Sequence, residues 1–151
     1  MIGILSTEEI EEVLKENVLG RIGCNDGIKT YVVPVNYVYN GTSIIAHSAE
    51  GLKIKMMREN KEVCFEVDDI KSYTNWRSVI AWGYYQELLD ERDRYNAMKL
   101  FVERMLHVKV SESAIVPGEV EKKVHSFSKK HVKPVIYRIV LTEKTGRFER
   151  E

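Results

Sequence analysis

The sequence predicts a mainly antiparallel β protein with some α-helix, a barrel or a coiled sheet with helices across its ends. Three observations predict this class. The chain has 151 residues, the size of one domain with its own core. Segments with strand-like alternation outnumber helical ones and are joined by short turns, so successive strands should pair antiparallel. Strands that bury both faces favour a closed or strongly curved sheet. We therefore expect one domain over residues 1–151.

The first predicted element is a helix over residues 6–17. Ser6 and Glu9 have the spacing of a capping box, in which each side chain accepts a hydrogen bond from the other residue's backbone N–H. Ile10, Val13 and Leu14 then recur at helical spacing, which predicts the face that packs on the core.

Two predicted strands joined by a turn follow this helix. Alternation of apolar and polar residues indicates strands over 18–24 and 28–39, with a turn at Asn25-Asp26-Gly27. Pro34 has no backbone N–H to donate. This places it at a sheet edge, at a bulge or on an unpaired side of the strand.

The rest of the chain alternates between strand and helical periods. Asn40-Gly41 is a strong two-residue hairpin signal, and Asp90 is a typical helix N-cap ahead of an apolar run at helical spacing. The basic segment 121–133 is interpreted as a mobile surface helix or an interaction edge. The expected elements are, in order, a strand over 42–47, a helix over 51–60, strands over 62–68 and 76–89 with a bend at Gly83, a helix after Asp90 whose face carries Met98, Phe101, Val102 and Met105, and a closing strand over 135–141.

The charge balance argues against a general polyanion binder. The chain has 23 basic and 23 acidic residues, a formal net charge of zero, so no overall positive field attracts a nucleic-acid backbone. Residues 30–49 carry no charge, but Pro34 and Asn40-Gly41 interrupt them, which favours two strands over a membrane span. The N-terminal residues do not resemble a signal peptide. We expect no nucleic-acid partner, no membrane partner and a cytoplasmic location.

The cysteines and histidines lack the spacing of a metal or redox site. Cys24 and Cys64 each lie in an apolar, strand-like run rather than in a C-x-x-C motif, and are expected to be free thiols. The four histidines lack zinc-ligand spacing. No metal site is expected.

The loop over 47–55 is the segment with the most chemical content. It brings Ser48, Gly51, Lys53 and Lys55 to the start of a predicted helix, where free N–H groups and the positive end of the helix dipole favour an anion. This arrangement fits a phosphate site. Ordinary strand-to-helix turns use the same spacing, so both interpretations stay open on spacing alone.

Five segments of the chain together resemble a known family. In order and spacing they are similar to the FMN-binding split-barrel proteins related to pyridoxamine 5'-phosphate oxidase, especially the nitroimidazole-resistance-like and general-stress-protein-like members. The resemblance implies a split β-barrel, an antiparallel Greek-key-like barrel with peripheral helices. It also implies a homodimer with FMN at the subunit interface, with FAD as the alternative cofactor. The segments are Gly20-Arg21-Ile22-Gly23, Tyr31-Val32-Val33-Pro34-Val35-Asn36-Tyr37, His47-Ser48-Ala49-Glu50-Gly51-Leu52-Lys53, Asn60-Lys61-Glu62-Val63-Cys64-Phe65-Glu66-Val67-Asp68 and Trp76-Arg77-Ser78-Val79-Ile80-Ala81-Trp82-Gly83-Tyr84.

The same resemblance implies a set of cofactor-binding residues. A phosphate dianion needs an ammonium group with N–H and hydroxyl donors, and a planar flavin needs apolar walls. The implied residues are Val35, Asn36 and Tyr37 against the isoalloxazine ring, His47 and Ser48 beside the ribityl chain and the phosphate, Lys53 on the phosphate, and Trp76, Arg77 and Ser78 from the partner subunit.

Several of these residues also have an ordinary structural interpretation. Tyr37 and Trp76 could be packing residues, and Lys55 a solvated helix residue. His47 could be a hydrogen-bonded histidine at the barrel rim. It could instead orient a substrate or deliver a proton, because an unperturbed histidine titrates at a pH of about 6.5, and it is the only candidate catalytic residue.

The function implied by the resemblance is FMN-dependent oxidation or reduction of a small organic substrate, with nitroaromatic reduction as the specific hypothesis. The alternative is a flavin- or haem-binding module without turnover, acting in storage or stress sensing. True pyridoxamine-phosphate oxidases have an Arg-rich, Pro-containing C-terminus that this sequence does not match. Vitamin B6 oxidation is therefore not expected.

Overall fold

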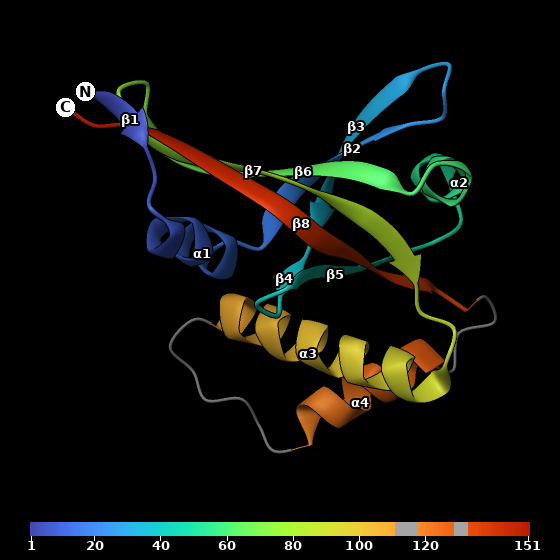
Figure 1. Cartoon of the computed structure of the whole chain (residues 1–151). Coiled ribbons are helices and arrows are strands. Elements are labelled where there is room, and N and C mark those ends of the chain that lie inside the picture. Colours follow the sequence, from blue (N-terminus) through green and yellow to red (C-terminus); the bar gives the residue numbers. More distant parts are fainter. Residues whose placement is uncertain (111–117, 129–132) are drawn as a thin grey trace.

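The computed structural model of the chain describes residues 1–110, 118–128 and 133–151. Its strands form one curled sheet, with helices packed against it (Figure 1). In chain order the elements are β1 (Ile2–Ile4), α1 (Thr7–Glu16), β2 (Leu19–Asn25), β3 (Thr30–Asn36), β4 (Val38–Tyr39), β5 (Ser43–Ser48), α2 (Leu52–Glu59), β6 (Glu62–Ser72), β7 (Asn75–Glu87), α3 (Glu91–Val110), α4 (Glu119–Ser128) and β8 (Val135–Glu149).

The strand order explains why the sheet closes on itself. Neighbouring strands run β3-β2-β6-β7-β8-β5-β4, with β1 paired to β8, and the pairings are antiparallel. The two ends of this order, β3 and β4, are consecutive in the chain and are separated only by Tyr37. One continuous segment therefore passes from the first edge of the sheet to the last, and the sheet curls into an incomplete barrel. The expected split barrel is confirmed.

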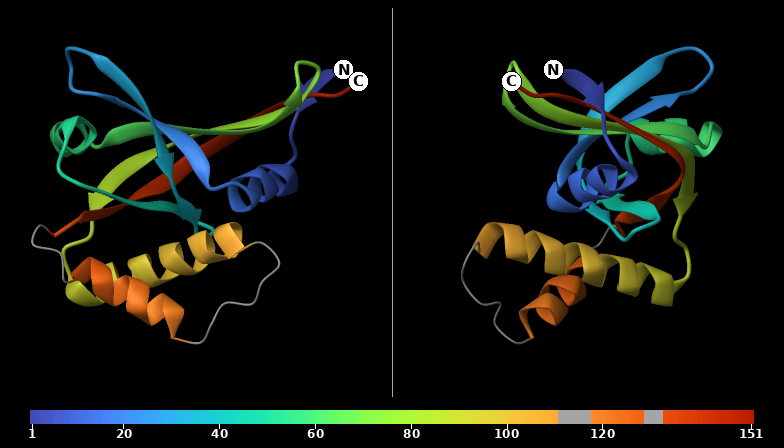
Figure 2. Two further views of the ribbon diagram at one scale, coloured as in Figure 1. Left: turned by 180° about the vertical axis from the view of Figure 1, so that it is seen from behind. Right: turned by 60° about the vertical axis from the view of Figure 1, so that its left-hand side comes forward.

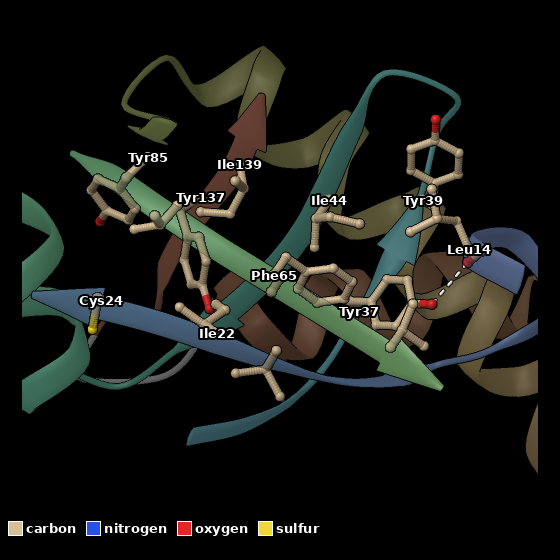
Figure 3. Packing of buried hydrophobic residues seen from close by; sticks show 14 of the residues in the cluster. Leu14, Ile22, Cys24, Tyr37, Tyr39, Ile44, Phe65, Tyr85, Tyr137 and Ile139 are labelled. Carbon is tan, nitrogen blue, oxygen red and sulfur yellow. Dashed lines mark hydrogen bonds between the residues drawn. The ribbon is translucent and has the colours of Figure 1, made fainter. Parts of the chain in front are cut away.

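The inside of the barrel holds the main hydrophobic core (Figure 3). Tyr37 is 0% exposed and meets the ring of Phe65 edge-on, with ring centroids 4.9 Å apart. Ile22 and Ile44 are also fully buried in this cluster. Tyr37, which lies between β3 and β4, is therefore part of the core inside the barrel.

Side chains satisfy the hydrogen-bonding groups at both ends of α1. At its start the predicted capping box is present, with the Glu9 N–H donating to Ser6 Oγ and the Ser6 N–H donating to the Glu9 carboxylate. The last four carbonyls of a helix have no partner within it. In α1 the Asn17 amide donates to Val13 O (2.8 Å), the Tyr37 hydroxyl to Leu14 O (2.8 Å), and the Arg104 guanidinium to Lys15 O and Glu16 O (3.1 Å each).

A second hydrophobic cluster attaches α3 and α4 to the outside of the barrel. Val38, Ile45 and Ile136 lie on β4, β5 and β8, and they pack with buried residues of α3 and with Val124 of α4. Figure 2 shows both helices on the same side of the barrel, next to β4 and β5. The prediction of an apolar face on α3 is confirmed, as is the Asp90 cap, whose carboxylate accepts from the Asp93 N–H at 3.2 Å.

Several elements differ from the predictions. The strand expected over 62–68 continues to Ser72 as β6. The long strand expected over 28–39 is divided at Tyr37, whose backbone N–H donates to Val18 O at 2.9 Å, one position beyond the last β2–β3 pair, Leu19 with Asn36. The closing strand expected over 135–141 continues to Glu149 and pairs with β7 and β1. Its second half has mostly polar side chains, so it lacks the alternation that marks a half-buried strand. The three-residue β1 is too short to produce a periodic signal.

Two local predictions are confirmed. Pro34 lies on β3, which is an edge strand of the sheet order. The pairing of β7 with β8 shifts register between Trp82 and Gly83, and a Cβ on Gly83 would lie 2.1 Å from Val140 O. Only glycine allows so close an approach between the two backbones.

Both cysteines are free. Among the described residues there is no cluster of side chains that could hold a metal ion, and none of the described helices is long and apolar enough to cross a membrane. Residues 121–128 of the basic segment lie on α4, whereas His131 lies outside the described residues.

Candidate functional site

A cavity of about 440 Å³ lies where one end of the barrel meets α2, α3 and α4. This volume is within the range of small-molecule sites. The cavity brings together four residues that the resemblance assigned to the cofactor: Val35, Asn36, His47 and Lys53. The full lining is Pro34, Val35 and Asn36 of β3, His47 of β5, Lys53 of α2, Phe101, Val102, Met105 and Leu106 of α3, and Lys123 of α4.

The Lys53 ammonium group lies at the edge of this cavity beside a hydroxyl. Its Nζ donates to Ser48 Oγ at 2.8 Å, and the Ser48 hydroxyl in turn donates to Ala49 O at 2.7 Å. Partial burial lowers the pKa of Lys53. No carboxylate of the described residues forms an ion pair with Lys53, in contrast to Arg21, Arg58, Arg77 and Lys144. A half-buried cation without a carboxylate partner favours an external anion.

The remaining walls of the cavity combine apolar side chains with further basic groups. The α3 residues form an apolar wall, and His47 meets the Phe101 ring edge-on with centroids 4.8 Å apart. Lys123 lines the side formed by α4. None of the described lining residues is acidic. The cavity therefore suits a ligand with a flat apolar part and an anionic group.

Tyr37 does not line this cavity. It points into the barrel, where its hydroxyl donates to Leu14 O (Figure 3), and burial raises its pKa. Of the two interpretations open from the sequence, packing residue or ring partner, the structure places it in the packing position.

Trp76, Arg77 and Ser78 lie away from the cavity in the same chain. They begin β7, which β2 and β6 separate from β3. Each has a partner within the chain: Trp76 Nε1 donates to Glu149 at 3.1 Å, Ser78 Oγ donates to Glu66 at 3.2 Å, and Arg77 donates to Asp69 at 3.0 Å. Within one chain, therefore, the predicted cofactor residues other than Tyr37 form two groups.

Sequence reasoning missed the α3 wall and Lys123 as site residues. The helical spacing of Phe101, Val102 and Met105 identified one apolar face of α3 but not which part of that face meets the barrel and which part lines a cavity. Lys123 lies outside the segments that carried the resemblance. A sequence pattern could not have found either, because both depend on where α3 and α4 dock.

One face of the sheet is not covered by the described helices (Figure 1). Several large apolar side chains are exposed on the strands of this face, among them Val32 at 65% and Trp82 at 39%. The register aligns Val32, Gly23, Cys64 and Trp82 in one row across β3, β2, β6 and β7. Because Gly23 has no side chain, this row forms a hollow, which belongs to a second cavity of about 550 Å³. An apolar surface of this kind is typical of an interaction surface.

Comparison with known proteins identifies the family. Residues 6–148, nearly the whole chain, match the sequence model described as pyridoxamine 5'-phosphate oxidase. The chain belongs to the pyridoxamine 5'-phosphate oxidase family. Among the relatives of this family member is an uncharacterised protein of Rhizobium meliloti, 34% identical over 85 residues. The match covers 56% of this chain and 56% of that protein, so it spans little more than half of the relative's length.

Solved structures of similar proteins share the fold of this family member. A FAD-binding protein from Mesorhizobium loti is 27% identical, with a TM-score of 0.76 and coverage of 99% of both chains. The FAD-binding protein from Mycobacterium smegmatis is also 27% identical, with a TM-score of 0.64 and coverage of 97% of this chain and 98% of that chain. A candidate 5-nitroimidazole resistance protein from Bacteroides thetaiotaomicron is 18% identical, with a TM-score of 0.71 and coverage of 98% and 87%. At this last identity the likeness concerns the fold alone.

Proposed function

We propose that this protein binds a flavin nucleotide in the cavity between the barrel and α3, and that it is a flavin-dependent oxidoreductase acting on a small organic molecule. Lys53 carries the proposal, because it is a half-buried ammonium group that donates to Ser48 Oγ and has no carboxylate partner among the described residues. In the proposed complex the flavin phosphate accepts from Lys53 and Ser48. The ring system lies between Val35-Asn36 and the apolar wall of α3.

Two observations support a flavin rather than another anionic ligand. The lining combines basic groups at the α2 side with an extended apolar wall, and a flavin needs both. Two similar structures, each 27% identical, are described as FAD-binding proteins. We propose FMN as the cofactor, because the Lys53 and Ser48 site serves one phosphate. FAD, which contains the same flavin phosphate, is the alternative.

The residues of this chain would bind and orient the cofactor and the substrate. A bound flavin would supply the hydride or electron transfer. His47 lines the cavity beside Phe101, where its imidazole would hold or deliver a proton. The α3 wall would exclude water from the ring. Reduction of nitroaromatic compounds is the specific activity that we propose to test.

We further propose that the active unit is a homodimer. The uncovered face of the sheet carries exposed apolar side chains, including Trp82 and Val32. Trp76, Arg77 and Ser78 do not reach the cavity of their own chain. A second copy docked on this face would bury the apolar row. The start of β7 in each copy would then lie at the cavity of the other copy.

The cofactor proposal is tested by the visible spectrum of the purified protein and by titration with FMN and riboflavin. Replacing Lys53 with alanine should weaken FMN binding by about ten- to a hundredfold, the equivalent of one charge-assisted hydrogen bond. Riboflavin has no phosphate, so its affinity should stay nearly constant. Lys55→Ala is the matched control, because Lys55 is an exposed residue of the same helix. A colourless protein that cannot be reconstituted with FMN or FAD would contradict the proposal.

The activity is tested separately on the flavin-loaded protein. With NADH or NADPH as electron donor, reduction of a nitroaromatic compound should exceed the rate given by free flavin. Stoichiometric flavin binding without reduction by either nucleotide would contradict the oxidoreductase proposal. That result would favour the module without turnover.

A further inference from the structure

A carboxylate lies in the loop that forms the proposed phosphate site. Glu50 stands between Ser48 and Lys53 in the chain, and its side chain is exposed. A negative charge in this loop opposes the binding of a phosphate dianion and could itself pair with the Lys53 ammonium. The affinity of the site for a phosphate therefore depends on whether the Glu50 carboxylate points towards Lys53 or away from it.

Arg58 holds the Glu50 carboxylate with two parallel hydrogen bonds. Its Nη1 and Nη2 donate to the two carboxylate oxygens at 2.8 and 2.9 Å. The same guanidinium also donates to Glu87 through Nε at 2.8 Å and Nη2 at 3.2 Å. The Tyr85 hydroxyl donates to Glu87 at 2.6 Å. The loop is thus connected through one arginine to a buried tyrosine of β7.

The geometry of α2 separates Arg58 from Lys53. The two residues are five positions apart on Leu52–Glu59, which places them about 140° apart around the helix axis. Lys53 is half-buried and lines the cavity, whereas Arg58 is exposed and pairs with Glu87 at the end of β7. Long side chains of a helix lean towards its N-terminus, so Arg58 can reach back to Glu50. The carboxylate is therefore held at the side of α2 away from Lys53.

We infer that Arg58 is a positioning residue for phosphate binding: it neutralises Glu50 and holds it away from Lys53, so that the loop presents the ammonium and the Ser48 hydroxyl without a competing carboxylate. This inference rests on the proposed function. Exposed ion pairs contribute little to stability. The role of Arg58 should therefore appear in phosphate affinity rather than in the melting temperature.

The test uses Arg58→Gln, Glu50→Gln and the double variant in the full chain, with FMN and riboflavin as probes. Arg58→Gln should weaken FMN binding by about five- to tenfold, as expected when one carboxylate is released near an anion, and should leave riboflavin binding unchanged. Glu50→Gln alone should bind FMN at least as well as the wild type. The double variant should recover most of the lost FMN affinity, because the carboxylate that Arg58 restrains is no longer present. Arg92→Gln, at an exposed arginine of α3, is the matched control.

The outcomes separate this inference from the proposed function. If the wild type binds FMN no better than riboflavin, both fail. If the wild type prefers FMN but Arg58→Gln keeps that preference, only the role of Arg58 is overturned. The role of Arg58 is also overturned if Arg58→Gln weakens the binding of FMN and of riboflavin equally. The same holds if adding Glu50→Gln to Arg58→Gln does not restore FMN binding. In either case Arg58 would act on the fold.

Discussion

At the residue scale, Tyr37 shows how one side chain can fit two interpretations of a sequence. Its alternation with Tyr31, Val33 and Val35 placed it on a strand face, and the resemblance placed it against a flavin ring. In the structure Tyr37 turns inward at the point where β3 becomes β4, and its hydroxyl reaches a carbonyl of α1. The alternation indicated the correct face, because Tyr31, Val33 and Val35 pack against the same core cluster, but it could not show that the Tyr37 hydroxyl reaches α1.

Replacing Tyr37 with phenylalanine distinguishes the two roles. Loss of the hydroxyl leaves Leu14 O without its partner, so the free energy of unfolding should fall by about 1–2 kcal/mol. The affinity for FMN should stay within about twofold, because Tyr37 does not line the cavity. Chemical denaturation and flavin titration measure the two effects. A large loss of flavin affinity with unchanged stability would contradict the core role.

Lys53 gives the proposed phosphate site a pH dependence. Burial lowers the pKa of the free ammonium group from its ordinary 10.5, and a bound phosphate would raise it again. The Lys53 contribution to FMN affinity is therefore complete below the lowered pKa and is lost as the pH rises towards the raised one. The ratio of FMN to riboflavin affinity should begin to fall below pH 10.5. Lys53→Arg should make this ratio nearly independent of pH over the same range, and a ratio that does not change in the wild type would argue against Lys53.

At the element scale, α3 both packs against the barrel and lines the cavity, and its sequence does not separate the residues of the two roles. Its apolar face was correctly predicted from residues at helical spacing. Met98 belongs to the hydrophobic cluster between the barrel, α3 and α4 but does not line this cavity, whereas Phe101, Val102 and Leu106 belong both to that cluster and to the cavity lining. The strand predictions were most accurate where alternation was strict, as in β2, ended four residues early for β6, and failed for β1 and the polar half of β8.

Met105 tests the cavity role of α3 with least harm to the core, because it is only half-buried and lines the cavity. Truncation of Met105 to alanine removes apolar contact area from the proposed ring site. The affinities for FMN and riboflavin should both fall by about tenfold. This differs from Lys53→Ala, which should affect FMN alone. If Met105→Ala binds FMN and riboflavin as tightly as the wild type does, the flavin ring does not lie against this part of α3.

At the scale of the whole molecule, the proposed site is distributed over two surfaces of one chain. The sequence resemblance supplied the residues of both groups, and the cavity unites Val35, Asn36, His47 and Lys53. The resemblance could not show that Arg77 also forms ion pairs within its own chain, with Glu12, Glu16 and Asp69. Contacts of that kind depend on α1 docking beside β7, which no local pattern encodes.

Trp82 tests the proposed dimer. Introducing a charge with Trp82→Glu at the β7 end of the exposed apolar row should prevent a second copy from docking, because an unpaired charge is costly to bury. Analytical ultracentrifugation should give a dimer for the wild type and a monomer for the variant, with weaker FMN binding in the monomer. Leu89→Glu, at a leucine that is 76% exposed outside this face, is the control. A wild type that sediments as a monomer would contradict the proposal.

The caps of α1 also bear on the order in which the molecule folds. The bonds at its start connect residues only three positions apart and can form at once. Two of the donors at its end, Tyr37 and Arg104, lie 23 and 89 positions from their acceptors. A ten-residue helix is marginal on its own in water. We therefore expect the first helix of the chain to be completed late, after β4 has crossed to the far edge of the barrel and α3 has docked.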